Sequence, residues 1–270
     1  MSISVIISAY INCTKSNISK ALHSVFYEQK LKPRQIVLVL DGPVQKELFD
    51  FVFAFQKKVD CDMLIHQIPE SKGFANALNQ GLELCKYEYI ARMDSDDICL
   101  SNRFHDQVEY LSNNPNVDVV GSWISEIDEN DNIIRDIVKY PETHEQCRAS
   151  FMCRSPLAHP ATMFKASFFK KSGNYPTKIL LAEDALLWHQ GFMNGCVFAN
   201  VQKVCLKFRR ASDFYRKRRN VKKSFKLLWY RISSINPSMK YGFRGHICAV
   251  LSFAMHFLPS FVKKILYDNR

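Results

Sequence analysis

The N-terminal part of the chain alternates between short apolar runs and segments whose apolar residues recur at helical spacing. The runs at residues 4–9, 35–41 and 89–93 are typical of strands buried on both faces of a sheet, and a further strand is expected at 63–68. Between these runs the spacing predicts helices, for example over residues 74–85. Strands that alternate with helices predict βαβ units and a parallel sheet covered on both sides.

The alternation changes in the second half of the chain. Residues 117–122 and 133–138 are expected to form strands joined by a turn, which indicates a mixed sheet. No internal repeat or low-complexity linker separates the two halves. We therefore predict an α/β fold with one compact domain over residues 1–205, followed by a helical segment over residues 206–270.

The composition indicates a globular protein that stays inside the cell. Of the 270 residues, 47% are hydrophobic and 23% are charged, which argues against disorder or a fibre. No run of about 18 apolar residues encodes a membrane-spanning helix, and residues 1–10 lack the basic region and cleavage signal of an export sequence. The nine cysteines are scattered without zinc-site spacing, so we expect buried or incidental thiols in a reducing compartment.

The net charge of +11 is concentrated at the C-terminal end. From residue 201 onward the chain has 17 Lys and Arg against two acids, whereas the first 200 residues have 20 bases and 24 acids. Such a segment is suited to an anionic membrane, a phosphate-bearing substrate or nucleic acid. Nucleic acid is the weakest of these partners because no recognition motif accompanies the charge.

The basic segment also contains an apolar stretch at residues 247–258. The stretch is too short to span a bilayer but fits an amphipathic helix that lies in the membrane interface, with basic flanks that meet anionic lipid. The alternative is a helix packed on the preceding domain with a solvated basic face. Both interpretations remain open from the sequence.

Acidic residues follow the predicted strands at the edge of the sheet where ligands bind in open α/β folds. They are Asp41; the cluster of Asp94, Asp96 and Asp97; and the pair Glu183 and Asp184. Three carboxylates this close together repel one another unless a cation lies among them, and Mg²⁺ or Mn²⁺ suits such oxygen ligands. The alternative is a solvated acidic loop that caps the next helix.

Two basic residues accompany these acids. Arg92 lies in the strand before the acidic cluster, where it is placed to brace the carboxylates or to meet a phosphate. Lys72 and Gly73 precede a helix whose first amides can face an anion. Neither a GxGxxG nor a GxxxxGK[ST] motif is present, so dinucleotide and P-loop binding have no support.

Six motifs in order along the first 210 residues resemble family 2 glycosyltransferases, in particular the bacterial enzymes of O-antigen, capsule and exopolysaccharide synthesis. They are SVIISAY near the N-terminus, VLVLDGP at 37–43, SKGFANALNQGL at 71–82, YIARMDSDD at 89–97, HP at 159–160 and AED at 182–184. The C-terminal sequences at 208–219 and 258–270 also resemble exopolysaccharide members. Each motif is weak alone, but six in register are specific.

The resemblance implies a GT-A fold, in which residues 1–97 form a Rossmann-like half that binds a nucleotide sugar and residues 98–205 bind the acceptor. The implied donor is a UDP-sugar. The resemblance assigns Ala9, Tyr10, Asp41 and Asp94 to nucleotide-sugar binding, and we expect Lys72, Arg92 and Ser95 to join them there. Asp96, with Asp94, is assigned to Mn²⁺ or Mg²⁺ beside the diphosphate.

On the acceptor side, the resemblance implies that Asp184 is the general base of an inverting transfer. Five further residues are assigned to the acceptor: Glu183, Trp188, His159, Arg209 and Arg216. Several have simpler alternatives: Tyr10 and Trp188 as packing residues, His159 as a structural histidine, and Lys72 as a solvated lysine. The chain departs from the family pattern at Ala185 and Leu186, where an aromatic residue and an acid are common.

Taken together, the sequence predicts a cytoplasmic glycosyltransferase, peripherally bound to the inner face of the cell membrane through its basic C-terminal region. Its expected acceptor is a saccharide linked to undecaprenyl diphosphate. Two alternatives remain: transfer to a protein or teichoic-acid acceptor, or a non-catalytic module that binds nucleotide or lipid. No nucleic-acid partner is expected, and the sequence does not predict an oligomeric state.

Overall fold

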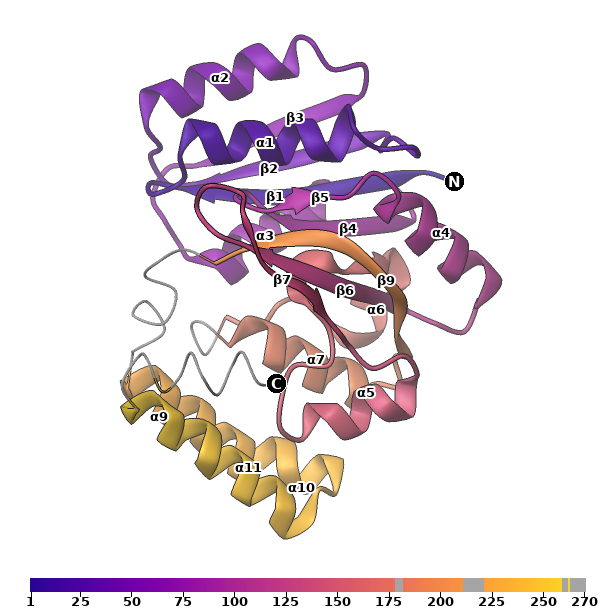
Figure 1. Cartoon of the computed structure of the whole chain (residues 1–270), viewed down its shortest axis with the longest axis vertical. Coiled ribbons are helices and arrows are strands. Elements are labelled where there is room, and N and C mark those ends of the chain that lie inside the picture. The colour runs from indigo at the N-terminus through magenta and orange to yellow at the C-terminus, as the bar shows by residue number, and fades with distance from the viewer. Residues whose placement is uncertain (178–181, 211–220, 259–261, 263–270) are drawn as a thin grey trace.

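The computed structural model describes residues 1–177, 182–210, 221–258 and 262 (Figure 1). Within them, a nine-stranded sheet has the order β3-β2-β1-β4-β8-β6-β9-β5, with β7 paired to β6. The α/β fold with a mixed central sheet is therefore confirmed. No helix among the described residues is both long and apolar enough to cross a membrane.

The N-terminal half is the predicted parallel sheet. Its strands are β1 (Ile3–Tyr10), β2 (Gln35–Asp41), β3 (Asp62–Ile68) and β4 (Tyr89–Asp94). The connecting helices are α1 (Lys15–Phe26), α2 (Lys46–Gln56) and α3 (Phe74–Leu84). Alternate residues of β1 point to opposite faces: Val5 and Ile7 pack in the core that includes α1 and α2, and Ile6 packs with α3. This two-sided burial explains the fully apolar runs in the sequence.

The second half adds antiparallel pairing to the same sheet. Its strands are β5 (Ile98–Cys99), β6 (Val119–Ile127), β7 (Ile133–Val138), β8 (Met163–Lys165) and β9 (Phe198–Arg209). Its helices are α4 (Arg103–Asn113), α5 (His144–Phe151), η1 (His159–Ala161), α6 (Ala166–Ser172) and α7 (Glu183–Met193). Strand β8 pairs antiparallel with β4 and β6, while β6 and β9 are parallel. Strand β9 runs past residue 205, so the expected division at that residue falls within a strand.

A separate helical unit follows, shown in yellow in Figure 1. It consists of α9 (Val221–Tyr230), the π-helix η2 (Arg231–Ile235), α10 (Asn236–Met239), α11 (Gly242–Ala254) and η3 (Met255–Phe257). The unit packs on α5 and α7. The Tyr241 hydroxyl donates to the Arg148 carbonyl over 2.5 Å, and His189 Nε2 lies 2.7 Å from Ser238 Oγ.

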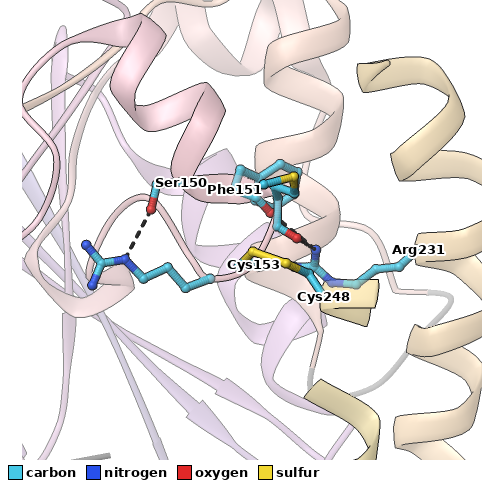
Figure 2. The surroundings of a disulfide bond; sticks show 7 residues. Ser150, Phe151, Cys153, Arg231 and Cys248 are labelled. Atoms are coloured by element: carbon cyan, nitrogen blue, oxygen red, sulfur yellow. Dashed lines mark hydrogen bonds between the residues drawn. A yellow bond between two sulfur atoms is a disulfide. The ribbon is translucent and has the colours of Figure 1, made fainter. Parts of the chain in front are cut away.

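A disulfide bond joins this helical unit to the preceding domain. Cys153, just after α5, is bonded to Cys248 of α11 (Figure 2). The expectation that all cysteines are free thiols is wrong for this pair, and the other cysteines are free. No local sequence pattern indicates the pairing, because the two residues are 95 positions apart and only the packing of α11 brings them together.

We expect the Cys153–Cys248 bond to stabilise the protein by restricting the unfolded chain. Removing it with Cys248→Ser should lower the free energy of unfolding by about 2–4 kcal/mol, the usual range for a bond that closes a long loop. Urea unfolding with and without reductant measures this difference. Reductant should lower wild type to the level of Cys248→Ser and should leave Cys248→Ser itself unchanged. The control Cys61→Ser removes a free cysteine and keeps the bond, so it should respond to reductant as wild type does. Equal stability of wild type and Cys248→Ser without reductant would contradict the expectation.

Candidate active site

The carboxyl ends of β1, β2 and β4 lie side by side and bring the predicted donor residues to one edge of the sheet. In the strand register, Tyr10 pairs with Asp41 and Ser8 pairs with Asp94. Ala9 is buried, whereas Tyr10 is 46% exposed and is not the core aromatic that the sequence left open. The parallel topology thus brings Ala9, Tyr10, Asp41 and Asp94 together.

Asp41 organises the loop that leads into α3. Its carboxylate accepts hydrogen bonds from the Lys72 amide (2.9 Å), the Gly73 amide (3.2 Å) and the Ser71 hydroxyl (2.8 Å). Gly73 has φ 90°, a left-handed conformation that suits glycine, and precedes the first residue of α3. The Lys72 and Gly73 amides are therefore committed to Asp41, while the Lys72 side chain is exposed.

The three carboxylates that follow β4 form a close cluster. One oxygen from each of Asp94, Asp96 and Asp97 lies within 4.8 Å of the others. Buried Arg92 pairs with Asp94, and its guanidinium lies 5.0 Å from the centre of the Phe74 ring. Asp97 is fully buried; its Oδ1 accepts the Arg209 amide (2.8 Å), and its Oδ2 has no hydrogen-bond partner among the residues that the structure describes.

This cluster fits a divalent cation. Burial, together with the neighbouring Asp94 charge, raises the pKa of Asp96 to about 6, and burial raises the pKa of Asp97 well above its usual range. Burial and mutual repulsion both disfavour the charged carboxylates, and a bound cation would favour them. Converging carboxylate oxygens, one of them unpartnered, are the donor set that Mg²⁺ and Mn²⁺ prefer. Asp94 and Asp96, the predicted metal residues, are placed to hold such an ion.

Arg209 contacts the loop that carries this cluster, whereas the sequence predicts that it contacts the acceptor. The residue is 5% exposed at the end of β9. Its Nε donates to the Asp96 carbonyl (2.8 Å), its Nη1 donates to the Asp128 carbonyl (2.8 Å), and its Nη2 lies 2.5 Å from Asp131 Oδ1. The guanidinium thus binds both the loop that carries Asp96 and the turn between β6 and β7.

Glu183 and Asp184 form the first turn of α7, beside the end of β4. The charges of Arg92 and Asp94 both act on Glu183, which links the two acidic groups into one site. Burial, with the neighbouring Asp184 charge, raises the pKa of Glu183 to about 7. Asp184 Oδ1 accepts a hydrogen bond from the Ala185 amide (2.7 Å).

His159 and Trp188 lie in the core rather than on an open acceptor surface. Trp188 is 0% exposed, and its Nε1 donates to Ser155 Oγ over 3.1 Å. His159 is buried, with Nε2 2.9 Å from the Tyr175 hydroxyl, and burial holds its pKa well below the usual range. This burial agrees with the alternatives given above, Trp188 as a packing residue and His159 as a structural histidine.

Tyr175 and Asn79 form a pair beside the site that no motif in the sequence predicts. Asn79 Nδ2 donates to the Tyr175 carbonyl and the Tyr175 amide donates to Asn79 Oδ1, each over 2.9 Å. With the His159 contact, these bonds hold Tyr175 against α3 and η1. Asn79 lies in the quoted 71–82 motif, but nothing in the sequence pointed to Tyr175 as its partner.

Ser95 and Arg216 complete the predicted residues. The buried Ser95 hydroxyl lies 3.4 Å from Cys13 Sγ, in the loop after β1, and burial raises the pKa of the Cys13 thiol to about 11. Arg216 lies outside the described residues. Its expected role in binding the acceptor stays a prediction.

Residues 4–172 match the family described as Glycosyl transferase family 2, so the chain belongs to this family and is a glycosyltransferase. It is 27% identical over 263 residues to the UDP-Gal:alpha-D-GlcNAc-diphosphoundecaprenol beta-1,3-galactosyltransferase of Escherichia coli, covering 97% of this chain and 91% of that protein. It is 29% identical to the amylovoran biosynthesis glycosyltransferase AmsE of Erwinia amylovora, covering 98% of each.

A solved structure shows the same fold. TarS residues 1–349 from S. aureus, in complex with UDP-GlcNAc, superposes with a TM-score of 0.65 at 16% identity, covering 96% of this chain and 82% of TarS 1–349. At this identity the likeness concerns the fold alone. It agrees with the α/β architecture expected for the family.

The raised pKa of Glu183 predicts a pH-dependent cost to stability. Folded Glu183 keeps its proton up to about pH 7, whereas the unfolded chain releases it near 4.5. The free energy of unfolding should therefore fall as pH rises from about 4.5 to about 7. Glu183→Gln removes this loss, so the variant should be more stable than wild type by roughly 2 kcal/mol at pH 8 and similar to it at pH 4.5.

Urea unfolding at several pH values measures the difference. Glu47→Gln is the matched control, because Glu47 is an exposed carboxylate in the first turn of α2. A gain for Glu183→Gln that is the same at pH 4.5 and pH 8 would contradict the prediction.

Proposed function

We propose that the protein is an inverting glycosyltransferase that moves a sugar from a UDP-sugar to a saccharide linked to a lipid diphosphate, in the synthesis of a surface polysaccharide. The observation that carries the proposal is the placement of two acidic groups at one edge of the sheet. The cluster after β4 suits a metal and a diphosphate, and the pair at the start of α7 suits acid–base chemistry. Arg92 and Asp94 lie close enough to Glu183 for their charges to act on it.

The donor side is assigned to the ends of β1, β2 and β4. Ala9, Tyr10 and Asp41 are placed for the base and ribose, next to one another in the strand register. Asp94 and Asp96 would hold Mn²⁺ or Mg²⁺, which when bound neutralises negative charge on a diphosphate leaving group. A UDP donor is supported by the name of the Escherichia coli relative, which includes UDP-Gal, and by the UDP-GlcNAc complex of TarS.

The acceptor side is assigned to the start of α7. Asp184 takes the proton of the acceptor hydroxyl as that oxygen forms the new glycosidic bond and the bond to the diphosphate breaks. One base on the face opposite the leaving group suffices for this single displacement, which inverts the anomeric configuration. Glu183, with a pKa of about 7, is protonated in part of the molecules at neutral pH and is suited to seat the acceptor by hydrogen bonding.

The acceptor class is supported by the relatives. The Escherichia coli enzyme is named for a diphosphoundecaprenol acceptor, and AmsE is named for amylovoran biosynthesis. By analogy, we assign a saccharide on undecaprenyl diphosphate as the acceptor of this chain. An acceptor with a lipid anchor places the enzyme at the inner face of the cytoplasmic membrane, as a peripheral protein.

Replacing the proposed base tests this assignment. Asp184→Asn keeps the size of the side chain but cannot take the proton, so turnover should fall at least about 100-fold. The affinity for UDP, measured by calorimetry, should stay within about twofold of wild type. The acceptor for the assay is a synthetic saccharide diphosphate with a short alkyl chain, and the panel of donors includes several UDP-sugars.

Glu145→Gln is the matched control, since Glu145 is an exposed carboxylate in the first turn of α5. It should retain wild-type turnover. Nuclear magnetic resonance of the product should show an anomeric configuration opposite to that of the donor. Retained turnover in Asp184→Asn, or a product with the donor's configuration, would refute the proposed mechanism.

A further inference from the structure

The C-terminal helical unit exposes large apolar side chains along two neighbouring helices. On α9, Phe225 and Trp229 follow one another at one-turn spacing, and Trp229 is 64% exposed. On α11 the exposed large apolar residues are Phe243, Ile247, Val250 and Leu251, of which Phe243 is 78% exposed. We call these six residues the α9/α11 face. Apolar residues gathered in this way are uncommon on a surface that meets only water.

The two helices lie beside each other, so their apolar residues form a shared surface. The ring centres of Phe225 on α9 and Phe253 on α11 are 6.1 Å apart, and Figure 1 shows the two helices side by side. The opposite side of α11 faces the domain: Gly245 and Ala249 are buried, and Cys248 is bonded to Cys153. The 3.6-residue period of the helix therefore directs the α9/α11 face away from the domain.

The charge of the unit favours one kind of partner. Residues 221–258 contain six Lys and Arg and no Asp or Glu. Lys226, Lys240 and Arg244 are exposed. Lys226 precedes Trp229 by about one turn, and Arg244 precedes Ile247 by about one turn, so these bases lie at the margin of the apolar residues. An aromatic and aliphatic surface with a purely basic margin is complementary to an anionic lipid surface.

Other partners fit these observations less well. A second copy of the chain would bring two basic margins together, which costs energy through like-charge repulsion. Nucleic acid would leave the apolar side chains facing a charged backbone. A bilayer interface accepts both parts of the surface, because Trp and Phe enter the acyl boundary while the bases meet the headgroups.

We infer that the α9/α11 face is a docking surface for a membrane rich in anionic lipid. This inference rests on the proposed function, which requires access to a lipid-linked acceptor, and identifies the residues that provide that access. The unit is fixed to the domain near the acceptor side of the site. Arg231 donates to the carbonyls of Phe151 (3.2 Å) and Met152 (3.4 Å) beside the disulfide (Figure 2), and the charge of Asp184 acts on it. Docking would thus hold the start of α7 at a set position relative to the lipid.

Sedimentation with lipid vesicles tests the inference on the full chain. Wild type should pellet with vesicles of phosphatidylcholine and phosphatidylglycerol, and much less with phosphatidylcholine alone. The double variant Trp229→Ser with Leu251→Ser should bind the anionic vesicles at least about tenfold more weakly. The double variant Lys226→Gln with Arg244→Gln should bind about thirtyfold more weakly and with less dependence on salt.

Ile134→Ser is the matched control, because Ile134 is a similarly exposed apolar residue on β7. It should bind vesicles as wild type does, and all variants should keep wild-type thermal unfolding. Three results would overturn the inference: unchanged binding by the Trp229/Leu251 variant, equal binding of wild type to neutral vesicles, or loss of a wild-type dimer in that variant by light scattering. The last result would identify the face as a self-interface.

The same samples separate this inference from the proposed function. The Trp229/Leu251 variant should bind UDP and turn over a short-chain acceptor in solution as wild type does, and should lose turnover at least about tenfold on acceptor embedded in anionic vesicles. Wild type that binds vesicles but turns over neither acceptor would refute the proposed function alone. Wild type that is active in solution but does not bind vesicles would refute only the docking surface.

Discussion

The repulsion among three carboxylates at the end of β4 is the constraint on which the site depends. Asp94, Asp96 and Asp97 lie together, and the last is fully buried, so their charges have little screening from water. Two buried arginines offset part of this cost. Arg92 pairs directly with Asp94, and Arg209 supports the backbone of the loop while its own amide binds Asp97. The rest of the positive charge is what a bound divalent ion would supply.

Meeting this constraint requires both halves of the chain. Arg92 comes from a strand of the parallel half, whereas Arg209 comes from the end of β9 in the second half. Arg209 also reaches Asp131 in the turn after β6, and Asp131 in turn binds Lys20 of α1 over 2.5 Å. The loop that carries Asp96 and Asp97 is therefore held by residues from both halves of the sheet. The site forms only because one mixed sheet continues through the two halves.

The sequence predicted those features that are local. Strands buried on both faces produce continuous apolar runs, and acids that follow such runs lie at the carboxyl edge of a parallel sheet. The positions of β1, β2 and β4 and of their acidic ends therefore follow from the sequence alone. What the sequence did not predict depends on contacts between distant residues. The burial of Trp188, the bracing role of Arg209 and the Cys153–Cys248 bond follow from how β9, α7 and α11 pack, and no local pattern encodes that packing. The same holds for the Asn79–Tyr175 pair.

We propose that the cluster of Asp94, Asp96 and Asp97 holds a metal that a nucleotide diphosphate needs for binding. Titration calorimetry with UDP, in the presence and absence of Mn²⁺, tests this metal site on wild type, Asp96→Ala and Asp136→Ala. Asp136→Ala is the control, because Asp136 is an exposed acid on β7. We expect wild type and Asp136→Ala to bind UDP at least about tenfold more tightly with Mn²⁺, and Asp96→Ala to lose this dependence. Binding of UDP to wild type that is equally tight without metal, or a metal dependence that survives in Asp96→Ala, would contradict it.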